Sequence, residues 1–230
     1  MTKIFCDIAD INLIKKFDRK KIVKGFTTNP SLMRKAGAKD YQNYSKKILG
    51  VTKKPISFEV FADNHDEMIK QGNKISKWAK NVFVKVPYSN TKGKFSGKVI
   101  KTLNSKKIKL NITAVYSATQ TQKILKNIDK KTNVIISIFA GRMAVAGKNP
   151  LPEFKKSLKI SKKFKNVEIL WASTREAYNL FQAKELGCQI ITVPPKIIET
   201  IENFGKTFDK LTKDTVKGFL IDSKKSRFKI

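Results

Sequence analysis

The hexapeptide Val82-Phe83-Val84-Lys85-Val86-Pro87 carries the clearest fold signal, because it is an apolar, β-branched run interrupted by a single lysine. Such a run is typical of a strand buried on both faces, as in a parallel sheet. It lies between two longer amphipathic stretches, residues 64–80 and 95–105, whose apolar residues recur at helical spacing. A strand between two helices indicates a repeating βα unit.

The same alternation extends outward over the chain, whose 230 residues allow about 29 per unit, close to the minimum for a βα repeat. Short runs rich in Val, Ile and Phe predict strands at 3–7, 22–27, 56–61, 82–86, 109–115, 134–139, 167–172 and 189–193. Amphipathic stretches predict helices at 10–19, 31–49, 64–80, 95–105, 117–128, 150–165, 174–186, 195–203 and 205–217.

Two α/β architectures fit this pattern, the open doubly wound sheet and the closed (β/α)8 TIM barrel. We favour the barrel, because there are eight units and neither a Gly-rich dinucleotide fingerprint nor a Walker loop follows any predicted strand. No flexible linker divides the chain. We therefore expect one domain over residues 1–230, in which 205–230 form an extra C-terminal helix and a basic tail.

Three predicted helices begin with recognisable capping residues. Asn29-Pro30 is typical of an N-cap followed by proline at the first helical position. Ser117-Ala118-Thr119-Gln120 and Ser173-Thr174-Arg175-Glu176 are both typical of capping boxes.

The net charge of +31 raises nucleic-acid binding as a hypothesis. However, only five of the 49 basic residues are arginines, and the lysines are scattered along the chain. Dedicated nucleic-acid surfaces use arginine forks and interleaved aromatic residues. We therefore expect no specific nucleic-acid partner, although such a field attracts small anions, including phosphorylated sugars.

Other classes are excluded by simple features. The sequence has no apolar stretch of about 18 residues, so we expect no membrane span, and residues 1–7 lack a signal-peptide core. Cys6, Cys188 and the single histidine His65 do not have the spacing of a metal site. We expect a cytoplasmic protein without a metal or other cofactor, whose two cysteines are core residues.

Polar residues are concentrated where the predicted strands end. In a (β/α)8 barrel the active site is built from these positions and the loops that follow them. The residues found there are Asp7, Thr27, Thr28, Asn29, Glu59, Lys85, Asn111, Thr113, Arg142, Ser173 and Arg175.

Lys85 is the most informative of these residues. Burial disfavours the charged form of a lysine, and a neutral amine attacks a carbonyl to form a Schiff base. That chemistry needs a carboxylate to move protons, and Asp7 and Glu59 are available. The alternative is that Lys85 forms a structural ion pair with Asp7 or Glu59.

The scarce arginines suggest a second function. Arg142 and Arg175 directly follow the sixth and seventh predicted strands. A planar guanidinium is well suited to hold phosphate, and phosphate sites in these barrels often lie near the last strands at a helix N-terminus, where Ser173 is expected. The alternatives are surface salt bridges for the arginines and a plain N-cap for Ser173.

Seven motifs together resemble those of the transaldolases, in the same order from about residue 3 to residue 195. They are Phe5-Cys6-Asp7-Ile8-Ala9-Asp10, Thr27-Thr28-Asn29-Pro30-Ser31, Ser57-Phe58-Glu59-Val60, Val84-Lys85-Val86-Pro87, Asn111-Ile112-Thr113, Phe139-Ala140-Gly141-Arg142 and Ala172-Ser173-Thr174-Arg175. The length is similar to that of the compact subfamily, which also contains the fructose-6-phosphate aldolases.

The resemblance implies a role for each matched residue. Lys85 would form the Schiff base, Asp7 would act on the hydroxyl whose proton is lost as the C3–C4 bond breaks, and Glu59 with Thr113 would relay protons through a water. The residues that it implies for substrate binding are Thr28, Asn29, Asn111, Phe139, Arg142, Ser173 and Arg175.

The implied reaction transfers a dihydroxyacetone unit from sedoheptulose 7-phosphate to glyceraldehyde 3-phosphate, giving erythrose 4-phosphate and fructose 6-phosphate. The runner-up is a fructose-6-phosphate aldolase, which resembles the pattern except for Gln in place of Glu59 and Tyr in place of Phe139. The resemblance also implies a homo-oligomer, a decamer in many compact members, in which the C-terminal helix packs on a neighbouring copy. The alternative is that the apolar residues of this segment, Phe204, Phe208, Leu211 and Val216, cover its own barrel.

Overall fold

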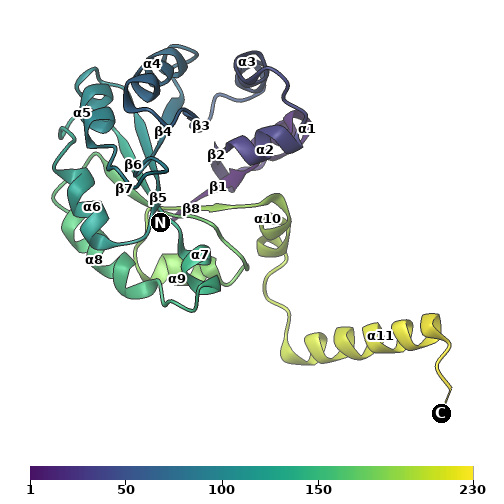
Figure 1. The fold of residues 1–230 in the computed structure, drawn as a ribbon. Helices are drawn as coiled ribbons and strands as arrows, with labels where there is room; N and C mark the ends of the chain where they lie inside the picture. The colour runs from purple at the N-terminus through teal and green to yellow at the C-terminus, as the bar shows by residue number, and fades with distance from the viewer. Residues whose placement is uncertain (230) are drawn as a thin grey trace.

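The computed structural model describes residues 1–229, in which eight parallel strands form a closed barrel in chain order (Figure 1). β8 pairs with β1 and closes the barrel. The predicted (β/α)8 barrel is therefore confirmed, and a strand lies at each predicted position. The strands are β1 (Lys3–Asp7), β2 (Val23–Thr27), β3 (Ile56–Glu59), β4 (Val82–Pro87), β5 (Leu110–Val115), β6 (Val134–Ile138), β7 (Val167–Trp171) and β8 (Ile190–Val193).

Helices connect the strands and surround the barrel (Figure 1). They are α1 (Ile11–Asp18), α2 (Pro30–Lys35), α3 (Tyr41–Val51), α4 (His65–Ser76), α5 (Gly97–Ser105), α6 (Ala118–Leu125), α7 (Ala140–Val145), α8 (Leu151–Ser161), α9 (Asn179–Glu185), α10 (Pro195–Glu202) and α11 (Phe208–Ser226).

The single helix predicted over 31–49 is wrong, because two helices, α2 and α3, occupy this range. After α2, Gly37 has a φ of +79°, a left-handed conformation that commonly ends a helix. Asp40 then caps α3, since its side chain accepts a hydrogen bond from Asn43 N at 2.8 Å. The break matters for the site, because it lets α3 begin beside the end of β3.

Two of the three predicted caps are confirmed. Asn29 caps α2, with Pro30 at the first helical position, and Ser117 forms a capping box with Gln120 at the start of α6. These caps fix how the chain leaves β2 and β5 at the carboxyl end of the barrel.

Two buried apolar clusters hold the fold together. The larger lies between the strands and the surrounding helices, and it includes Cys6 and Cys188 as buried free thiols, as predicted. The smaller lies inside the barrel and consists of Phe5, Phe83, Ile135, Leu170, Ala172 and Ile190. The interior of the barrel is therefore a packed core rather than a pore.

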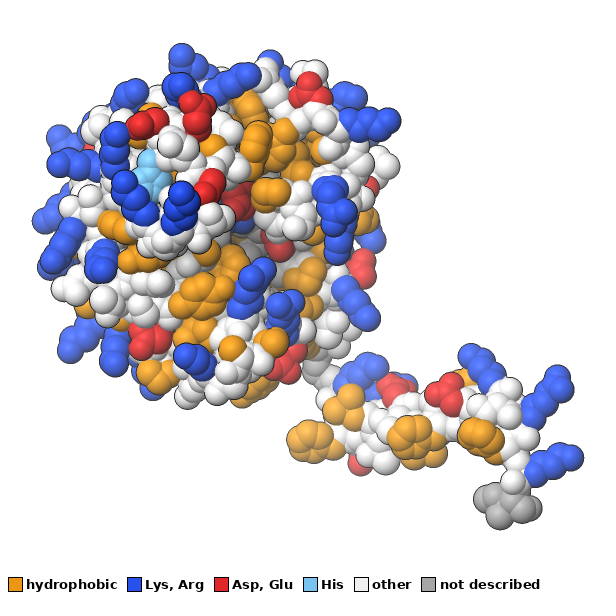
Figure 2. Space-filling model, viewed as in Figure 1, with side chains coloured by type: hydrophobic (Ala, Val, Ile, Leu, Met, Phe, Trp, Pro, Cys, Tyr) orange, Lys and Arg blue, Asp and Glu red, His pale blue; other side chains and the backbone are white. Residues whose placement is uncertain are grey.

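The predicted C-terminal amphipathic segment is helical and longer than expected, since α11 also takes in the first residues of the expected basic tail. Residue 230 lies outside the described part. α11 projects away from the barrel, with exposed apolar side chains along its length (Figures 1 and 2). Basic side chains are scattered over the visible face of the barrel, most of them around its edge (Figure 2). No helix within residues 1–229 is long and apolar enough to cross a membrane.

Candidate active site

The carboxyl ends of the strands surround a cavity of about 410 Å³. A second cavity of about 610 Å³ adjoins it. Both share residues of their lining, so together they form one opening at the mouth of the barrel. The shared residues that matter below are Asn29, Lys35, Lys85, Thr113, Arg142 and Arg175.

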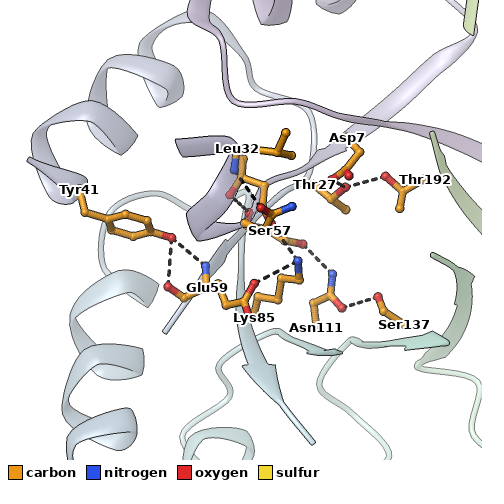
Figure 3. A network of polar contacts seen from close by, with 12 residues as sticks. Asp7, Thr27, Leu32, Tyr41, Ser57, Glu59, Lys85, Asn111, Ser137 and Thr192 are labelled. Carbon is orange, nitrogen blue, oxygen red and sulfur yellow. Dashed lines mark hydrogen bonds and ion pairs between the residues drawn. The ribbon is translucent and has the colours of Figure 1, made fainter. Parts of the chain in front are cut away.

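Lys85 reaches the floor of this opening from the middle of β4, and only 8% of its side chain is exposed. Its Nζ lies 3.2 Å from Glu59 Oε2 on the neighbouring strand β3 (Figure 3). The same Nζ donates a hydrogen bond to the carbonyl oxygen of Thr28 at 2.9 Å. The amine is thus held by two partners on one side, while the other side faces the cavity.

Asp7 ends β1 on the opposite part of the floor. Thr27 Oγ1 donates a hydrogen bond to Asp7 Oδ1 at 2.6 Å, and it lies 2.6 Å from Thr192 Oγ1. The Thr27 hydroxyl has only one hydrogen, which it donates to Asp7. The Thr192 hydroxyl is therefore the donor of the second hydrogen bond. Burial raises the pKa of the Asp7 carboxyl, although the charge of Lys85 and the bond from Thr27 act in the opposite direction.

A chain of three polar side chains crosses the barrel between Lys85 and β6 (Figure 3). Asn111 Nδ2 donates to Ser57 Oγ at 2.9 Å, and Ser137 Oγ donates to Asn111 Oδ1 at 2.7 Å. The amide of Asn111 is therefore held in one orientation. Buried polar groups that satisfy one another in this way make the floor rigid.

Thr113 differs from these residues, because its buried Oγ1 has no hydrogen-bond partner within residues 1–229. It lines both cavities. Buried hydroxyl groups are normally hydrogen-bonded, so a group like this one is suited to bind a molecule inside the opening.

Three exposed cations surround the mouth. Arg142 lies on α7, Arg175 follows β7, and Lys35 lies in the last turn of α2. The guanidinium carbon of Arg142 lies 5.7 Å from the centre of the Phe139 ring, so the ring supports it. The arrangement favours an anion at the entrance, above the buried amine.

The predicted helix start at Ser173 is wrong, because α9 begins only at Asn179. Ser173 instead has a φ of +63°, and its carbonyl oxygen passes so close to Gly141 that a β-carbon there would lie 1.7 Å away. The chain after β7 therefore bends over α7 before any helix begins. Asn179 Oδ1 accepts hydrogen bonds from the backbone N–H groups of Arg175 and Glu176, at 3.2 and 3.3 Å, and holds this loop.

The chain is similar to known proteins over nearly its whole length. Residues 4–230 match the family described as Transaldolase/Fructose-6-phosphate aldolase. The chain belongs to this family. It is 31% identical over 229 residues to a "Probable transaldolase" of Bdellovibrio bacteriovorus, which covers 99% of this chain and 100% of that protein.

A second relative, a "Probable transaldolase" of Caldicellulosiruptor saccharolyticus, is 32% identical over 223 residues, covering 92% of this chain and 99% of the relative. The fold is also similar to that of N-acetylneuraminate lyase from Mycoplasma synoviae. That similarity has a TM-score of 0.54 with 11% sequence identity, over 82% of this chain and 68% of the lyase. At that identity it concerns the barrel alone.

Within this family member, the structure brings most of the predicted site residues to one opening. Those that line it are Asp7, Asn29, Glu59, Lys85, Thr113, Phe139, Arg142, Ser173 and Arg175. Thr28 and Asn111 instead lie in the wall, where Thr28 Oγ1 donates to Ser57 O at 2.7 Å. Thr28 and Asn111 therefore act on the opening by holding the residues that line it.

Among the lining residues that received no role in the sequence analysis are Thr27, Lys35, Ser137 and Thr192. Ser137 and Thr192 interrupt apolar runs in the same way as Lys85, so a search for any polar residue within a predicted strand finds them. Lys35 has no such signal, because it is one lysine among many on a helix surface.

Taken together, the opening combines a buried amine, two carboxylates and a free hydroxyl beneath a ring of cations. An amine next to a proton-transferring carboxylate is suited to condense with a carbonyl. The cations above it suit a substrate that carries its negative charge at the other end.

Proposed function

We propose that this protein is a transaldolase, which transfers a three-carbon dihydroxyacetone unit between sugar phosphates through a Schiff base on Lys85. The observation that carries the proposal is the contact between the buried Lys85 amine and Glu59, 3.2 Å apart on the floor of an open cavity. A lysine used only as a structural partner has no need to face a cavity.

In the first step, Lys85 Nζ attacks the ketone carbon of the donor sugar. The carbinolamine then loses water, and a proton must reach the departing hydroxyl. Glu59 is adjacent to the amine, and the Thr113 hydroxyl in the same opening supports its role by holding the water that is expelled or added. The reverse sequence hydrolyses the imine.

In the second step, the C3–C4 bond breaks as a base removes the proton of the C4 hydroxyl. The bonding electrons move into the imine, which becomes an enamine, and the aldose phosphate leaves. Asp7 is suited to be the base, because its raised pKa makes the carboxylate more basic than an ordinary aspartate. The enamine then attacks the aldehyde of the acceptor.

The substrate phosphate is proposed to bind at the rim, held by Arg142, Arg175 and Ser173. Lys35 adds a third cation, which the sequence analysis did not predict. Asn29 lines the opening and is proposed to bind a hydroxyl of the transferred unit, although its Oδ1 also accepts the hydrogen bond from Leu32 N that caps α2.

Two residues support transaldolase over the related aldolase. This chain has Glu59 and Phe139 at the two positions where the aldolases of the subfamily that it resembles have Gln and Tyr. The names of both relatives described above support the same choice. A hydrophobic Phe139 beside the floor also shields the enamine from water.

The proposal extends to location and assembly. Free thiols at Cys6 and Cys188 support a reducing compartment, the cytoplasm. The exposed apolar residues of α11, including Phe208, Phe219 and Leu220, support a homo-oligomer in which this helix packs on a neighbouring copy, as in a decamer. Light scattering coupled to size-exclusion chromatography measures the mass directly.

The test of the chemistry is to trap the Schiff base. The protein is incubated with fructose 6-phosphate without an acceptor and reduced with borohydride, and the modified peptide is located by mass spectrometry. We expect a three-carbon adduct on Lys85 that accumulates, because no acceptor removes it. Continuous release of free dihydroxyacetone instead indicates an aldolase.

Two variants control this experiment. Lys85→Ala should form no adduct and lose activity by about 10⁴-fold or more, because the nucleophile is gone. Lys109→Ala should behave as wild type, since Lys109 Nζ binds the carbonyl of Lys80 outside the opening. Folded wild-type protein without an adduct on Lys85 would refute the proposed mechanism.

A further inference from the structure

Tyr41, the first residue of α3, contacts the end of β3 through its hydroxyl group. Its OH donates a hydrogen bond to the carbonyl oxygen of Glu59 at 3.0 Å, and accepts one from the backbone N–H of the same residue at 2.9 Å (Figure 3). One side chain thus satisfies both main-chain groups of a residue that carries a proposed catalytic carboxylate.

These two groups lack a strand partner because the neighbouring strand stops short. β2 pairs with β3 at Phe26↔Ile56 and Thr27↔Ser57, and no pair extends to Glu59. On the other side β4 continues, and Val60 N donates to Lys85 O at 3.0 Å. In a parallel sheet, successive residues of an inner strand bond in turn to the strand on one side and to the strand on the other. The N–H and C=O of Glu59 therefore face the side where β2 is missing.

The hydroxyl of Tyr41 therefore takes the place of the missing strand. Its ring is fixed edge-on by Phe61 at 5.3 Å and lies 6.1 Å from Trp78. Burial raises the pKa of the phenol above its ordinary value, so the hydroxyl keeps the proton that it donates across the working pH range. Tyr41 does not line the opening, so any effect on the reaction must act through Glu59.

We propose that Tyr41 is a positioning residue, which holds the backbone of Glu59 and thereby sets the place of its carboxylate beside Lys85. This inference rests on the proposed Schiff-base function. It assigns to α3 a role in catalysis that does not involve contact with substrate. A small displacement of a proton-transferring group is enough to slow a reaction strongly.

Tyr41→Phe keeps the ring and removes only the hydroxyl. We expect the rate of formation of the borohydride-trapped Lys85 adduct, and kcat, to fall about tenfold. KM for fructose 6-phosphate should stay unchanged, since no group that touches the sugar is altered. The pH profile of kcat should change as well, because the group that moves protons is displaced.

The chain offers a matched control on the same helix. Tyr44 is also partly buried, and its OH donates one hydrogen bond to the carbonyl of Ala36 at 3.1 Å, away from Glu59. Tyr44→Phe removes an equivalent hydroxyl from α3 and should leave kcat and its pH profile unchanged. Equal adduct rates in Tyr41→Phe and Tyr44→Phe would overturn the inference.

A double-mutant cycle separates positioning from a general loss of structure. In a Glu59→Gln background the carboxylate is already absent, so adding Tyr41→Phe should cause little further loss of rate. A full tenfold loss in that background would show a merely structural effect and would also overturn the inference. Phe61→Leu gives a second variant that keeps the fold, because Phe61 is exposed, and it should lower kcat in the same direction but less.

Failure of the proposed function is distinguishable from failure of this inference. If wild-type protein forms no adduct on Lys85, the proposed function fails and the inference falls with it. If the wild type forms the adduct and Tyr41→Phe forms it equally fast, only the inference fails.

Discussion

Two adjoining layers inside the barrel are built by the same strands but have opposite chemistry. The lower layer is apolar, and the layer above it, toward the carboxyl ends, is polar. Side chains two positions apart on a strand share a face, so one strand can contribute to both layers, as β1, β4, β6 and β8 do. The pairs, with the apolar residue first, are Phe5 and Asp7, Phe83 and Lys85, Ile135 and Ser137, and Ile190 and Thr192.

The contrast between the two layers separates stability from chemistry in this barrel. The lower layer is a packed apolar core, which needs only shape and burial. In the upper layer, buried polar groups are stabilised by bonds to one another, as Thr27 is by its bonds with Asp7 and Thr192. A change in the lower layer should therefore affect folding, and a change in the upper layer should affect mainly the reaction.

The largest expected effect comes from the upper layer. Asp7→Asn removes the proposed base and should lower kcat about 10³-fold, within the usual range for a lost general base. Adduct formation at Lys85 through the intact six-carbon sugar should persist, because imine formation precedes the step that Asp7 serves. Loss of all adduct in a folded variant would contradict the assigned step.

The same variant should be more stable than the wild type at neutral pH. Because burial raises the pKa of Asp7 in the fold, ionising it costs folding free energy. The cost is absent below the ordinary aspartate pKa of about 3.9 and complete above the raised value. Urea unfolding of both proteins should show a stability gain at pH 7 that vanishes near pH 3, and a less stable variant at pH 7 would contradict it.

A smaller effect is expected from the lower layer. Gly25 lies against the Phe5 ring, and an added β-carbon would meet three ring atoms at 2.6–2.7 Å. Gly25→Ala should therefore lower the free energy of unfolding by about 1–3 kcal/mol, while the kcat of the protein that remains folded stays close to wild type.

Two controls sharpen this test. Phe5→Leu shortens the opposing side chain and should reduce the penalty when combined with Gly25→Ala. Gly50→Ala, in α3 with open space around the new methyl group, should instead stabilise the protein by about 0.5–1 kcal/mol. A neutral Gly25→Ala would mean that the lower layer is loosely packed.

The smallest effect is expected at the rim. Lys35→Ala removes one exposed cation and should raise KM for fructose 6-phosphate about twofold to fivefold, in line with the modest contribution of exposed charges. The effect should shrink at high salt and be absent with unphosphorylated fructose. Lys39→Ala, which removes a nearby lysine that does not line the opening, provides the control, and equal KM values in both variants would exclude Lys35 from phosphate binding.

Much of the fold was predictable, because strand and helix periodicity are local properties of this chain. Eight apolar runs separated by amphipathic stretches gave the barrel, and Lys85 attracted notice as a charge inside such a run. The errors lie where tertiary contacts override local preference. Ser173 has the sequence of a capping box, yet the close approach to Gly141 bends the chain there and delays the helix to Asn179.

The residues near the site show the same division. Thr113 was predictable as a polar residue in the last part of a strand and Arg142 from its position after one, whereas Tyr41 and Lys35 were not. Both lie on helices with ordinary amphipathic patterns. Lys35, at the end of α2, lines the opening, whereas Tyr41, which follows the turn at Gly37, meets the backbone of Glu59. No local sequence pattern predicts where such a residue lies in the folded protein.

From its sequence alone, this chain specifies the order of its strands and helices and the polar residues at each strand end, since both follow from periodicity and composition. The three-dimensional arrangement settles which of those residues meet: Lys85 with Glu59, Thr27 with Asp7, and Tyr41 with the Glu59 backbone. The physical reason is that barrel closure and strand register are set by packing among distant segments. Within that packing, the early end of β2 left two backbone groups that only a side chain from α3 satisfies.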